Sequence, residues 1–522
     1  MSVSTQKSVE TTEPPPGGTR HLGVALIVIA FAQLMIVLDA TIVNIALPRI
    51  QRDASQHLSQ ADQVQWVVTA YALALGSLLL LGGRLGDLYG RRKMFVVGVG
   101  IFSIASLLGG LAPTGTLLIS ARVLQGVGAA LAQPAALALI NTTFPVGKER
   151  NRAMAVYAAM SGMGAAVGLI LGGALTQALG WEWTFFINVP IGLAVAIAAP
   201  RVLVESEGHD GRLDIPGAVT ATAGLFGIVY GLSHAGGHSW GDALTLVPLG
   251  LGIALLVIFV IVESRVQHPL LPLRIVADRT RGVSLFAMLI VGAGMFAMFF
   301  FLGLFLQQVL GYSPIKSGLA FLPFSAGIVV AAGIATNVVA RIDPRWIAGF
   351  GGILATFGMW GFTHLSVDSG YWSHLFPYIV VMSLGMGLVF IPLTLTATAG
   401  VRGDDAGAAA SALNTMQQVG GAVGIAALTT VFTHAATAHG KVLGAAAAAK
   451  AKAAAAAGQT PTSAQVAAGK HQIALHVQTY ASSHVYWVAA GMILIGALSL
   501  FAFLTVSHEH LQTDGNAAVA AA

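Results

Sequence analysis

Cysteine is absent from the sequence, and charged residues are scarce. Without a Cys among the 522 residues, disulfides, thiolate metal sites and cysteine nucleophiles are excluded. Charged residues make up only 9% of the chain, whereas soluble globular domains carry about 25%. The sequence also has no glycine-rich phosphate loop, no paired acidic motif and no His-Glu-x-x-His. We therefore expect neither an enzyme nor a resident cofactor, and ATP is not indicated as an energy source.

Apolar side chains dominate instead. They account for 56% of the residues, and the mean hydropathy is +0.79, which indicates that lipid is the solvent for most of the chain. The 63 glycines fit helices that pack closely in a membrane. A net charge of +5 does not indicate a nucleic-acid partner, because the basic residues lie in short loops between apolar stretches.

Fourteen apolar stretches are long enough to cross a bilayer, since a spanning helix needs about 20 residues. An even number of spans places both termini on one side of the membrane. We therefore predict an all-α polytopic membrane protein. The stretches cover about residues 22–47, 64–83, 94–112, 115–141, 152–176, 184–204, 214–234, 244–263, 283–308, 315–340, 346–366, 374–400, 407–433 and 484–506.

Lysine and arginine indicate which side that is, because cytoplasmic loops are enriched in them. With the N terminus inside, 18 of the 26 basic residues are cytoplasmic, seven are external and Arg122 lies within a span. The polar segment 1–21 is typical of a cytoplasmic tail rather than of a cleaved signal. We expect a multi-pass, monomeric protein of a bacterial plasma membrane, embedded in the lipid bilayer, with both termini cytoplasmic.

One external loop, residues 434–483, is long and rich in alanine. Its run Ala445–Ala457 is compatible with either a helix or a mobile segment. Histidines at its two ends are spaced five residues apart, which is poor for two ligands on one helix face. A metal site is therefore not expected.

Two ionisable residues lie deep within expected spans, and the first is Asp39. A charge inside a span costs about 2.5–3.5 kcal/mol on insertion scales, so it indicates a function. A buried carboxyl group can bind and release a proton near neutral pH. Asp39 is thus a candidate proton-coupling acid. The alternative is a structural carboxylate bonded to neighbouring polar groups.

The second is Arg122, early in the fourth expected span. Arginine stays charged even there, so it cannot carry the proton, but it can tune a carboxylate or hold an anion. A purely structural counter-charge is the alternative. At 100° per residue, Gln133 returns to the face of Arg122 and Gln125 lies about 60° away. We expect both glutamines to line a substrate cavity.

The loop after the second expected span combines glycines with charges. Gly83 and Gly90 permit a tight turn and close helix approach. Asp87 can pair with Arg91, and Arg92 adds to the positive charge. Such a clasp could form in one conformation and break in another. A plain basic loop would explain the arginines but not the spacing of glycine and aspartate.

Two further spans offer candidate residues for the substrate cavity. Asn414, Gln417 and Gln418 follow helical spacing in the thirteenth span, where contact between helices is the alternative. Phe296 and Phe300 belong to a group of aromatics in the ninth span that is too wide for one helix face, so that part of it meets lipid.

Several of these segments together resemble the major facilitator superfamily and, more narrowly, its fourteen-span drug:proton antiporter family. The segment Gly83–Arg92 is similar to the superfamily's inner-loop motif. Arg122–Gly126 is similar to the fourth-span motif, whose arginine is linked to proton coupling. Leu38–Pro48 is similar to the first-span motif of the fourteen-span group. Trp181–Gly192 and Ser411–Gly424 also resemble that family.

The fifth-span antiporter motif is present in altered form. Its glycines are kept, but Leu169 stands where the family usually has proline. The change affects the kink of the motif and, to a small extent, the expected direction of transport. The glycines that carry the resemblance are Gly164, Gly168, Gly172 and Gly173.

The resemblance implies two pseudo-symmetric six-helix bundles with two additional helices between them. On this basis the N-terminal bundle covers 22–204, the extra helices and linkers cover 205–275, and the C-terminal bundle covers 276–506. Residues 507–522 form a second cytoplasmic tail. Rocking of one bundle against the other would give alternating access.

The function expected is export of lipophilic neutral or monocationic small molecules, such as drugs, antibiotics and dyes, in exchange for protons. The C-terminal spans show no convincing buried acid that would suit a dication. Alternatives are a proton-coupled uptake symporter, an exporter of one specific metabolite and a non-transporting sensor. The fourteen-span peptide transporters are disfavoured, since their Glu-x-x-Glu-Arg pattern is missing from the first span.

Overall fold

The computed structural model describes residues 22–53, 64–145, 147–206, 213–267, 269–399, 401, 403–456 and 462–507. Every regular element within these ranges is a helix. The two expected terminal tails lie outside them, apart from Ser507. The all-α prediction is confirmed for the described part of the chain.

The first half of the chain forms the helices α1 (Leu22–Arg52), α3 (Trp66–Tyr89), α4 (Arg91–Gly110), α5 (Gly115–Thr143), α6 (Lys148–Ala178), α7 (Trp183–Phe186) and α8 (Asn188–Val202). A hairpin of α9 (Ile215–Gly237) and α10 (Ala243–Glu263) follows.

The second half begins with α11 (Leu273–Ala277) and α12 (Arg279–Ala297), which continues through the π-helical segments η2 (Met298–Leu302) and η3 (Phe305–Val309). The remaining elements are α13 (Pro314–Ala320), α14 (Leu322–Val338), α15 (Pro344–Gly361), η4 (Phe362–His364), η5 (Tyr371–Leu375), α16 (Phe376–Thr398), α17 (Gly403–Ala456) and α18 (Ser463–Phe503).

Each of the fourteen apolar stretches falls on a helix. Twelve helices within the described ranges are long and apolar enough to cross a membrane. The other two stretches coincide with α6, whose described apolar part is only Met163–Ala178, and with α15, which has 18 residues. The chain is therefore a polytopic membrane protein, and the count of fourteen spans stays a prediction.

The two halves repeat one packing pattern. In the first half, α1 packs on α6 and α8, α5 packs on α3 and α4, and α4 packs on α8. In the second half, α12 packs on α17 and α18, α16 packs on α14 and α15, and α15 packs on α18. The correspondence follows chain order helix by helix, so the two six-helix units have the same internal arrangement.

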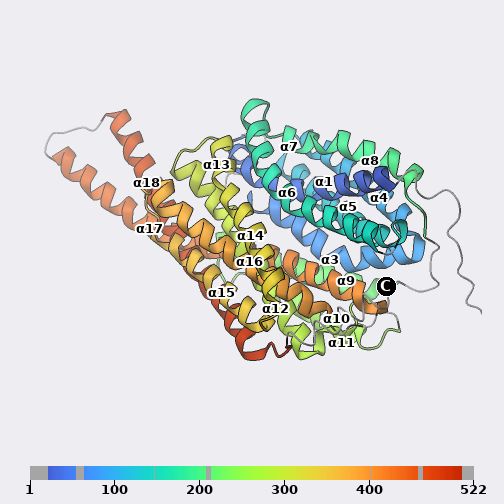
Figure 1. Cartoon of the computed structure of the whole chain (residues 1–522). Coiled ribbons are helices and arrows are strands. Elements are labelled where there is room, and N and C mark those ends of the chain that lie inside the picture. Colours follow the sequence, from blue (N-terminus) through green and yellow to red (C-terminus); the bar gives the residue numbers. More distant parts are fainter. Residues whose placement is uncertain are drawn as a thin grey trace, which may run out of the picture.

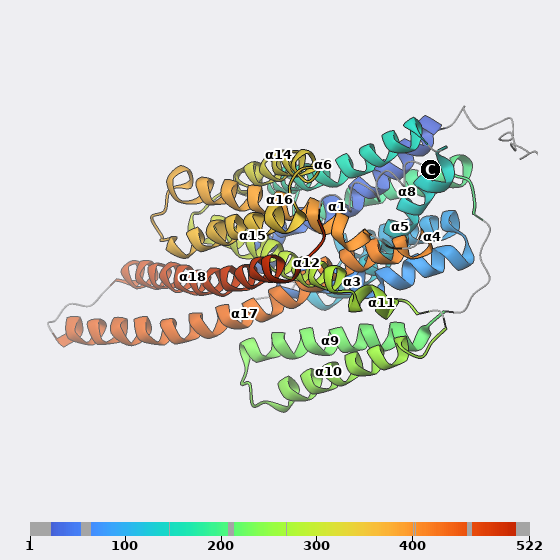
Figure 2. The same ribbon diagram turned by 60° about the horizontal axis from the view of Figure 1, so that its bottom comes forward.

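The α9–α10 hairpin lies at the edge of the molecule. Helix α9 packs on α17 and α3, whereas α10 packs chiefly on α9 (Figure 2). Between the two halves, α3 packs on α17 and α6 packs on α13. The hairpin therefore contacts one helix from each half.

Helices α17 and α18 continue well beyond the other helices (Figure 1). Helix α17 has 54 residues, so at 1.5 Å per residue it is about 80 Å long, whereas the hydrocarbon core is about 30 Å thick. The segment 434–483, expected as a loop, is helical through Ala456 and again from Ser463. We refer to this end of the molecule as the α17–α18 end and to the opposite one as the α3–α4 end.

Glycine pairs bring these helices into backbone contact. A β-carbon at Gly98 of α4 would lie 2.7 Å from the carbonyl oxygen of Gly128 in α5, and one at Gly128 would lie 2.7 Å from the carbonyl oxygen of Gly98. The α4–α5 contact therefore needs glycine on both sides, as is common where membrane helices pack closely.

We predict that Gly128→Val destabilises the protein by about 3 kcal/mol or more, because overpacking typically costs about 1–3 kcal/mol and the atoms in the way are backbone. Thermal unfolding of the purified protein in detergent measures the effect. Gly100→Val, on α4 with no atom within 4 Å of its β-carbon position, is the matched control and should change little. Equal stability of the two variants would contradict the packing described.

Candidate functional site

A buried ion pair lies within the first half. Asp39 of α1 and Arg122 of α5 are 0% and 1% exposed, and Arg122 Nη1 lies 2.5 Å from Asp39 Oδ2. The two residues are 83 positions apart in the chain. The two ionisable residues singled out from the sequence are therefore direct partners.

Three polar side chains complete the surroundings of Asp39. Gln125 Nε2 and Asn188 Nδ2 each donate to Asp39 Oδ1 at 2.9 Å. Both amides also donate to the hydroxyl of Ser106, at 2.7 and 3.3 Å. All three side chains are buried, so the carboxylate accepts hydrogen bonds from one charged donor and two neutral ones.

Arg122 has partners beyond Asp39. Its Nε donates to the carbonyl of Val67 at 2.8 Å, and its Nη1 donates to Gln125 Oε1 at 2.9 Å. The guanidinium carbon lies 4.3 Å from the centre of the Tyr71 ring, a cation–π contact. Both members of the pair are thus solvated by protein groups in place of water, as a buried charge requires.

Five helices supply this network, namely α1, α3, α4, α5 and α8. Gly126, next to Gln125, allows α5 to approach α3, since a β-carbon there would lie 2.7 Å from the carbonyl oxygen of Tyr71. The network therefore depends on the close packing of the whole first half. We call it the Asp39 network.

The glycines of the altered fifth-span motif lie against the helix that carries Asp39. A β-carbon at Gly168 would lie 3.0 Å from the carbonyl oxygen of Leu38, and one at Gly172 would lie 2.8 Å from that of Ile42. Gly164 faces the side chain of Val37. Motion of α6 would therefore bear directly on the backbone next to Asp39.

Gly173 faces the other half of the molecule. A β-carbon there would lie 2.6 Å from Ile315 Cα in α13. One turn earlier in α6 lies the buried Leu169. Its carbonyl oxygen contacts Gly318 of α13. The motif helix therefore contacts both α1 and the second half.

The loop between α3 and α4 forms the expected charged clasp. Arg91 donates to Asp87 Oδ1 through Nε at 3.2 Å and Nη2 at 3.0 Å. Gly90 has a φ of 100°, a conformation that favours glycine. A β-carbon at Gly83 would lie 3.7 Å from Pro134 Cβ of α5, an ordinary contact distance.

Arg92 connects this loop to the end of α8. Its side chain lies 3.4 Å from Glu205 Oε2, and its backbone N–H donates to Glu205 Oε1 at 2.9 Å. Its Nη1 also donates to the carbonyls of Pro200 and Leu203. A β-carbon at Gly90 would lie 2.7 Å from Glu205 Oε1. The clasp therefore joins α3, α4 and α8, all from the first half.

The residues predicted to line a substrate cavity do not gather in one place. Gln125 belongs to the Asp39 network, whereas Gln133 is half-buried elsewhere on α5. Asn414 is exposed and donates to the carbonyl of Ala410 in its own helix.

Gln417 and Gln418 lie at helix contacts of α17. The backbone of Gln417 approaches Gly292, and Gln418 Cβ lies 2.9 Å from the β-carbon position of Gly76 in α3. Phe296 packs against Gly421, and the buried Phe300 lines a cavity of about 250 Å³ near the α17–α18 end.

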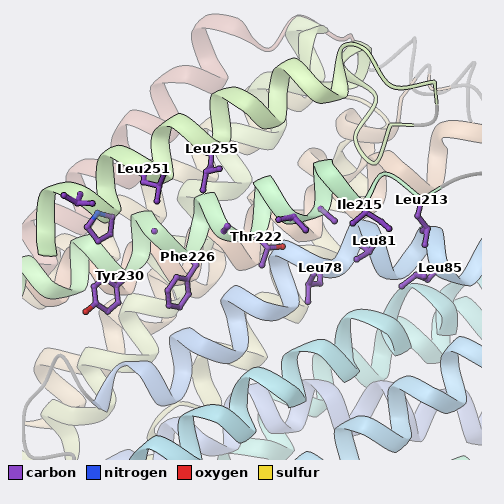
Figure 3. A pocket seen from close by; sticks show the side chains of 16 residues that line it. Leu78, Leu81, Leu85, Leu213, Ile215, Thr222, Phe226, Tyr230, Leu251 and Leu255 are labelled. Atoms are coloured by element: carbon purple, nitrogen blue, oxygen red, sulfur yellow. The ribbon is translucent and has the colours of Figure 1, made fainter.

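A larger apolar groove, of about 830 Å³, lies between α3, α9 and α10. Figure 3 shows side chains such as Leu78, Phe226 and Leu251 along it. The polar side-chain atoms in the lining of this groove come from Thr222 and Tyr230. None of the residues predicted from the sequence lines this groove. Within the described ranges, no group of His, Asp and Glu could hold a metal ion.

Sequence reasoning missed three polar residues of these sites. Asn188 and Ser106 complete the Asp39 network, and Glu205 binds the start of α4. Asn188 had a signal, since it is a lone amide in an apolar expected span. Ser106 and Glu205 resemble many other serines and loop acids in the sequence.

Comparisons with known proteins agree with this architecture. A bacterial homologue of the human lysosomal transporter Spinster, solved in an inward-facing and unoccupied conformation, has the same fold, with a TM-score of 0.61 and 16% identity. The match covers 93% of this chain and 98% of that one. The fold is therefore that of a polytopic helical transporter. Residues 29–425 match the model of the Major Facilitator Superfamily, and the chain belongs to that family.

Relatives within the family include proteins named for antibiotic resistance and for antibiotic export. The puromycin resistance protein pur8 of Streptomyces alboniger is 47% identical over 79% of this chain and 82% of its own length. The cephamycin export protein CmcT of Amycolatopsis lactamdurans is 39% identical over 78% of this chain and 84% of its own. The protein is thus a membrane transporter related to antibiotic exporters.

We predict that Arg122→Met destabilises the protein by about 3–5 kcal/mol, because it leaves Asp39 as an unpaired buried charge. The double variant Asp39→Asn/Arg122→Met should lose less than the sum of the two single losses. Thermal unfolding in detergent measures all three variants. Strictly additive losses would contradict the ion pair.

Proposed function

We propose that this protein exports lipophilic neutral or monocationic small molecules in exchange for protons, with Asp39 as the proton-coupling acid. The observation that carries the proposal is the burial of Asp39 against Arg122 in the middle of the first half. The antibiotic-resistance relative pur8 and the cephamycin export protein CmcT support the cargo class, and CmcT supports the outward direction.

Asp39 could act as a coupling acid because the surrounding groups offer partners whether or not it carries a proton. As a carboxylate it is stabilised by Arg122, Gln125 and Asn188. As a protonated acid it no longer needs a cation, and Arg122 keeps the Val67 carbonyl and the Tyr71 ring as partners. Proton binding would therefore release Arg122 from α1 without leaving the guanidinium unsolvated.

Alternating access would move the two halves against each other. At the α17–α18 end they are joined by hydrogen bonds from Gln307 to the Ile45 carbonyl, at 3.0 Å, and from Gln308 to Gln51, at 2.8 Å. Gly173 of α6 meets Ile315 at the same end. These contacts support a state closed at the α17–α18 end, which has to open there to release cargo.

The basic residues support the proposed orientation. Arg84, Arg91, Arg92 and Lys93 lie at the α3–α4 end, which suits the cytoplasm. Protons would then enter from the α17–α18 end. The membrane potential would supply about 2.3 kcal/mol for each proton and each 100 mV. Protonation of Asp39 would accompany outward release of cargo, and deprotonation toward the cytoplasm would reset the site.

A proton-coupled uptake symporter is the alternative direction for the same coupling acid. With Leu169 in the place of the family's usual proline, the motif helix lacks the residue expected to kink it. Even so, Gly164, Gly168 and Gly172 keep their contact with α1, and the relative CmcT is named as an export protein. Both observations favour export.

We predict that Asp39→Asn abolishes dye efflux driven by an imposed pH gradient in inverted membrane vesicles, because asparagine cannot bind and release the proton. Asp242→Asn changes an acid at the surface, in the α9–α10 connection, and should retain efflux. Substantial pH-driven export by Asp39→Asn would show that another group couples the proton. Dye movement in the opposite direction would identify a symporter.

The charge of the cargo gives a second test. In the described part of the second half, no acidic side chain is buried, since the buried acids are Asp39, Asp214 and Glu263. We therefore predict that mono-quaternary dyes are exported at least about tenfold faster than their bis-quaternary analogues, a difference of about 1.4 kcal/mol. Efflux assays in a pump-deficient bacterium measure the ratio. Equal export of both classes would contradict the cargo proposed.

A further inference from the structure

Apart from the Asp39–Arg122 ion pair, two buried acids lie together where the chain enters and leaves the α9–α10 hairpin. Asp214 precedes α9 and caps it, since its Oδ1 accepts from the Gly217 N–H at 2.8 Å. Glu263 is the last residue of α10, and its Oε2 accepts from the Leu271 N–H at 3.1 Å. The two residues are 2% and 3% exposed. One oxygen of each carboxyl group is thus satisfied by a backbone donor.

The other two oxygens, Asp214 Oδ2 and Glu263 Oε1, are buried and have no hydrogen-bond donor. Both are directed toward the same point, because a β-carbon at Gly217 would meet Asp214 Oδ2 and would lie 2.9 Å from Glu263 Oε1. Glycine at 217 therefore leaves the space in which the two orphan oxygens face each other. A buried acceptor without a donor is costly, and here two of them face one another.

In the described part of the chain, no basic side chain donates a hydrogen bond to Asp214 Oδ2 or to Glu263 Oε1. Among the side chains described, Asp214 is the charged group that acts on Glu263. Arg265, two residues after Glu263, is exposed, and neither Arg265 nor Arg84 and Asp87 at the end of α3 are among the groups that act on Glu263. The contrast with Asp39 is clear, since that carboxylate has Arg122 and two amides as donors.

Two carboxylates that share a buried site cannot both ionise at low cost, because like charges there repel strongly. A single proton between them removes the repulsion and satisfies both orphan oxygens, with one carboxyl donating and the other accepting. We propose that Asp214 and Glu263 form a proton-binding site, separate from Asp39, in which one proton is shared between Asp214 Oδ2 and Glu263 Oε1.

The position of the site gives this proton a mechanical consequence. The segment before Asp214 comes from the first half, and the segment after Glu263, held through Leu271, leads to the second half. With the proton bound, the two ends of the hairpin are fastened together at the α3–α4 end. Loss of the proton places two negative charges side by side and drives these ends apart. The spacing of the two connecting segments would then respond to pH on that side of the membrane.

Infrared spectroscopy of the full chain in liposomes tests the site directly, through the carbonyl band of a protonated carboxyl group. The measurement is made in an Asp39→Asn background, so that its result does not depend on the proton-coupling role of Asp39. We expect a protonated-carboxyl band at pH 7 that disappears when Glu263→Gln is added. Glutamine keeps an acceptor for the Leu271 N–H and supplies an amide donor to Asp214.

Asp242→Asn is the matched control, because Asp242 caps α10 as Asp214 caps α9. The Leu244 N–H and the side chain of His234 hold the pKa of Asp242 below its ordinary value, so Asp242 is ionised at pH 7. Its replacement should leave the band unchanged. A band that persists at full intensity in Glu263→Gln, or that is missing before the substitution, would overturn the proposal.

Thermal unfolding supplies a second readout that does not need the band to be resolved. The folded protein holds the shared proton more tightly than the unfolded chain does, so the contribution is present at low pH and is lost as the pH rises. We expect the Tm of the Asp39→Asn protein to fall as the pH rises above about 4, where carboxyl groups of an unfolded chain ionise, and to level off once the folded protein has lost the shared proton. Glu263→Gln should remove that fall, and an identical pH dependence of Tm in both proteins would count against the shared proton.

Discussion

The ion pair between Asp39 and Arg122 is the interaction on which the first half of this transporter depends. Burying two charges in a membrane protein is tolerable only when each keeps enough partners, and here α1, α3, α4, α5 and α8 all provide them. The helices must therefore approach closely, which explains why glycines occur at the crossings around the pair. The same closeness makes any change in the charge of Asp39 an event that all five helices experience.

A change in the charge of Asp39 can affect the second half of the molecule through two helices that contact both halves. Helix α6 carries three glycines against α1 and a fourth against α13, so it links the neighbourhood of Asp39 to the second half. Helix α3 carries Val67 and Tyr71 for Arg122 and packs on α17 through Gly76. Helix α3, which contacts Arg122, and helix α6, which packs on α1 beside Asp39, therefore both contact the second half. A proton-dependent change at the pair can therefore alter how the two halves meet.

Much of the fold could be predicted from the sequence because lipid imposes a simple rule of long apolar helices. The same rule made Asp39 and Arg122 conspicuous, since charges are rare in spans, and the structure places them in contact. The helical extension of α17 and α18 was not predictable with the same certainty, because an alanine-rich segment outside the membrane has no apolar period to reveal it. The scattered positions of Asn414, Gln417 and Phe296 show a further limit: helical spacing identifies a shared face but not what that face meets. Asp214 and Glu263 lie 49 residues apart at span ends, where acids are common, so only their burial reveals them.

Proton flux driven by the cargo tests the central claim most directly, because coupling between two ligands is reciprocal. Liposomes containing the purified protein and a trapped pH-sensitive dye would be given a gradient of a monocationic substrate such as ethidium, with no imposed pH gradient. The account predicts that the substrate gradient moves protons in the opposite direction in the wild-type protein and moves none in Asp39→Asn. Substrate-driven proton movement that is the same in both proteins would contradict it.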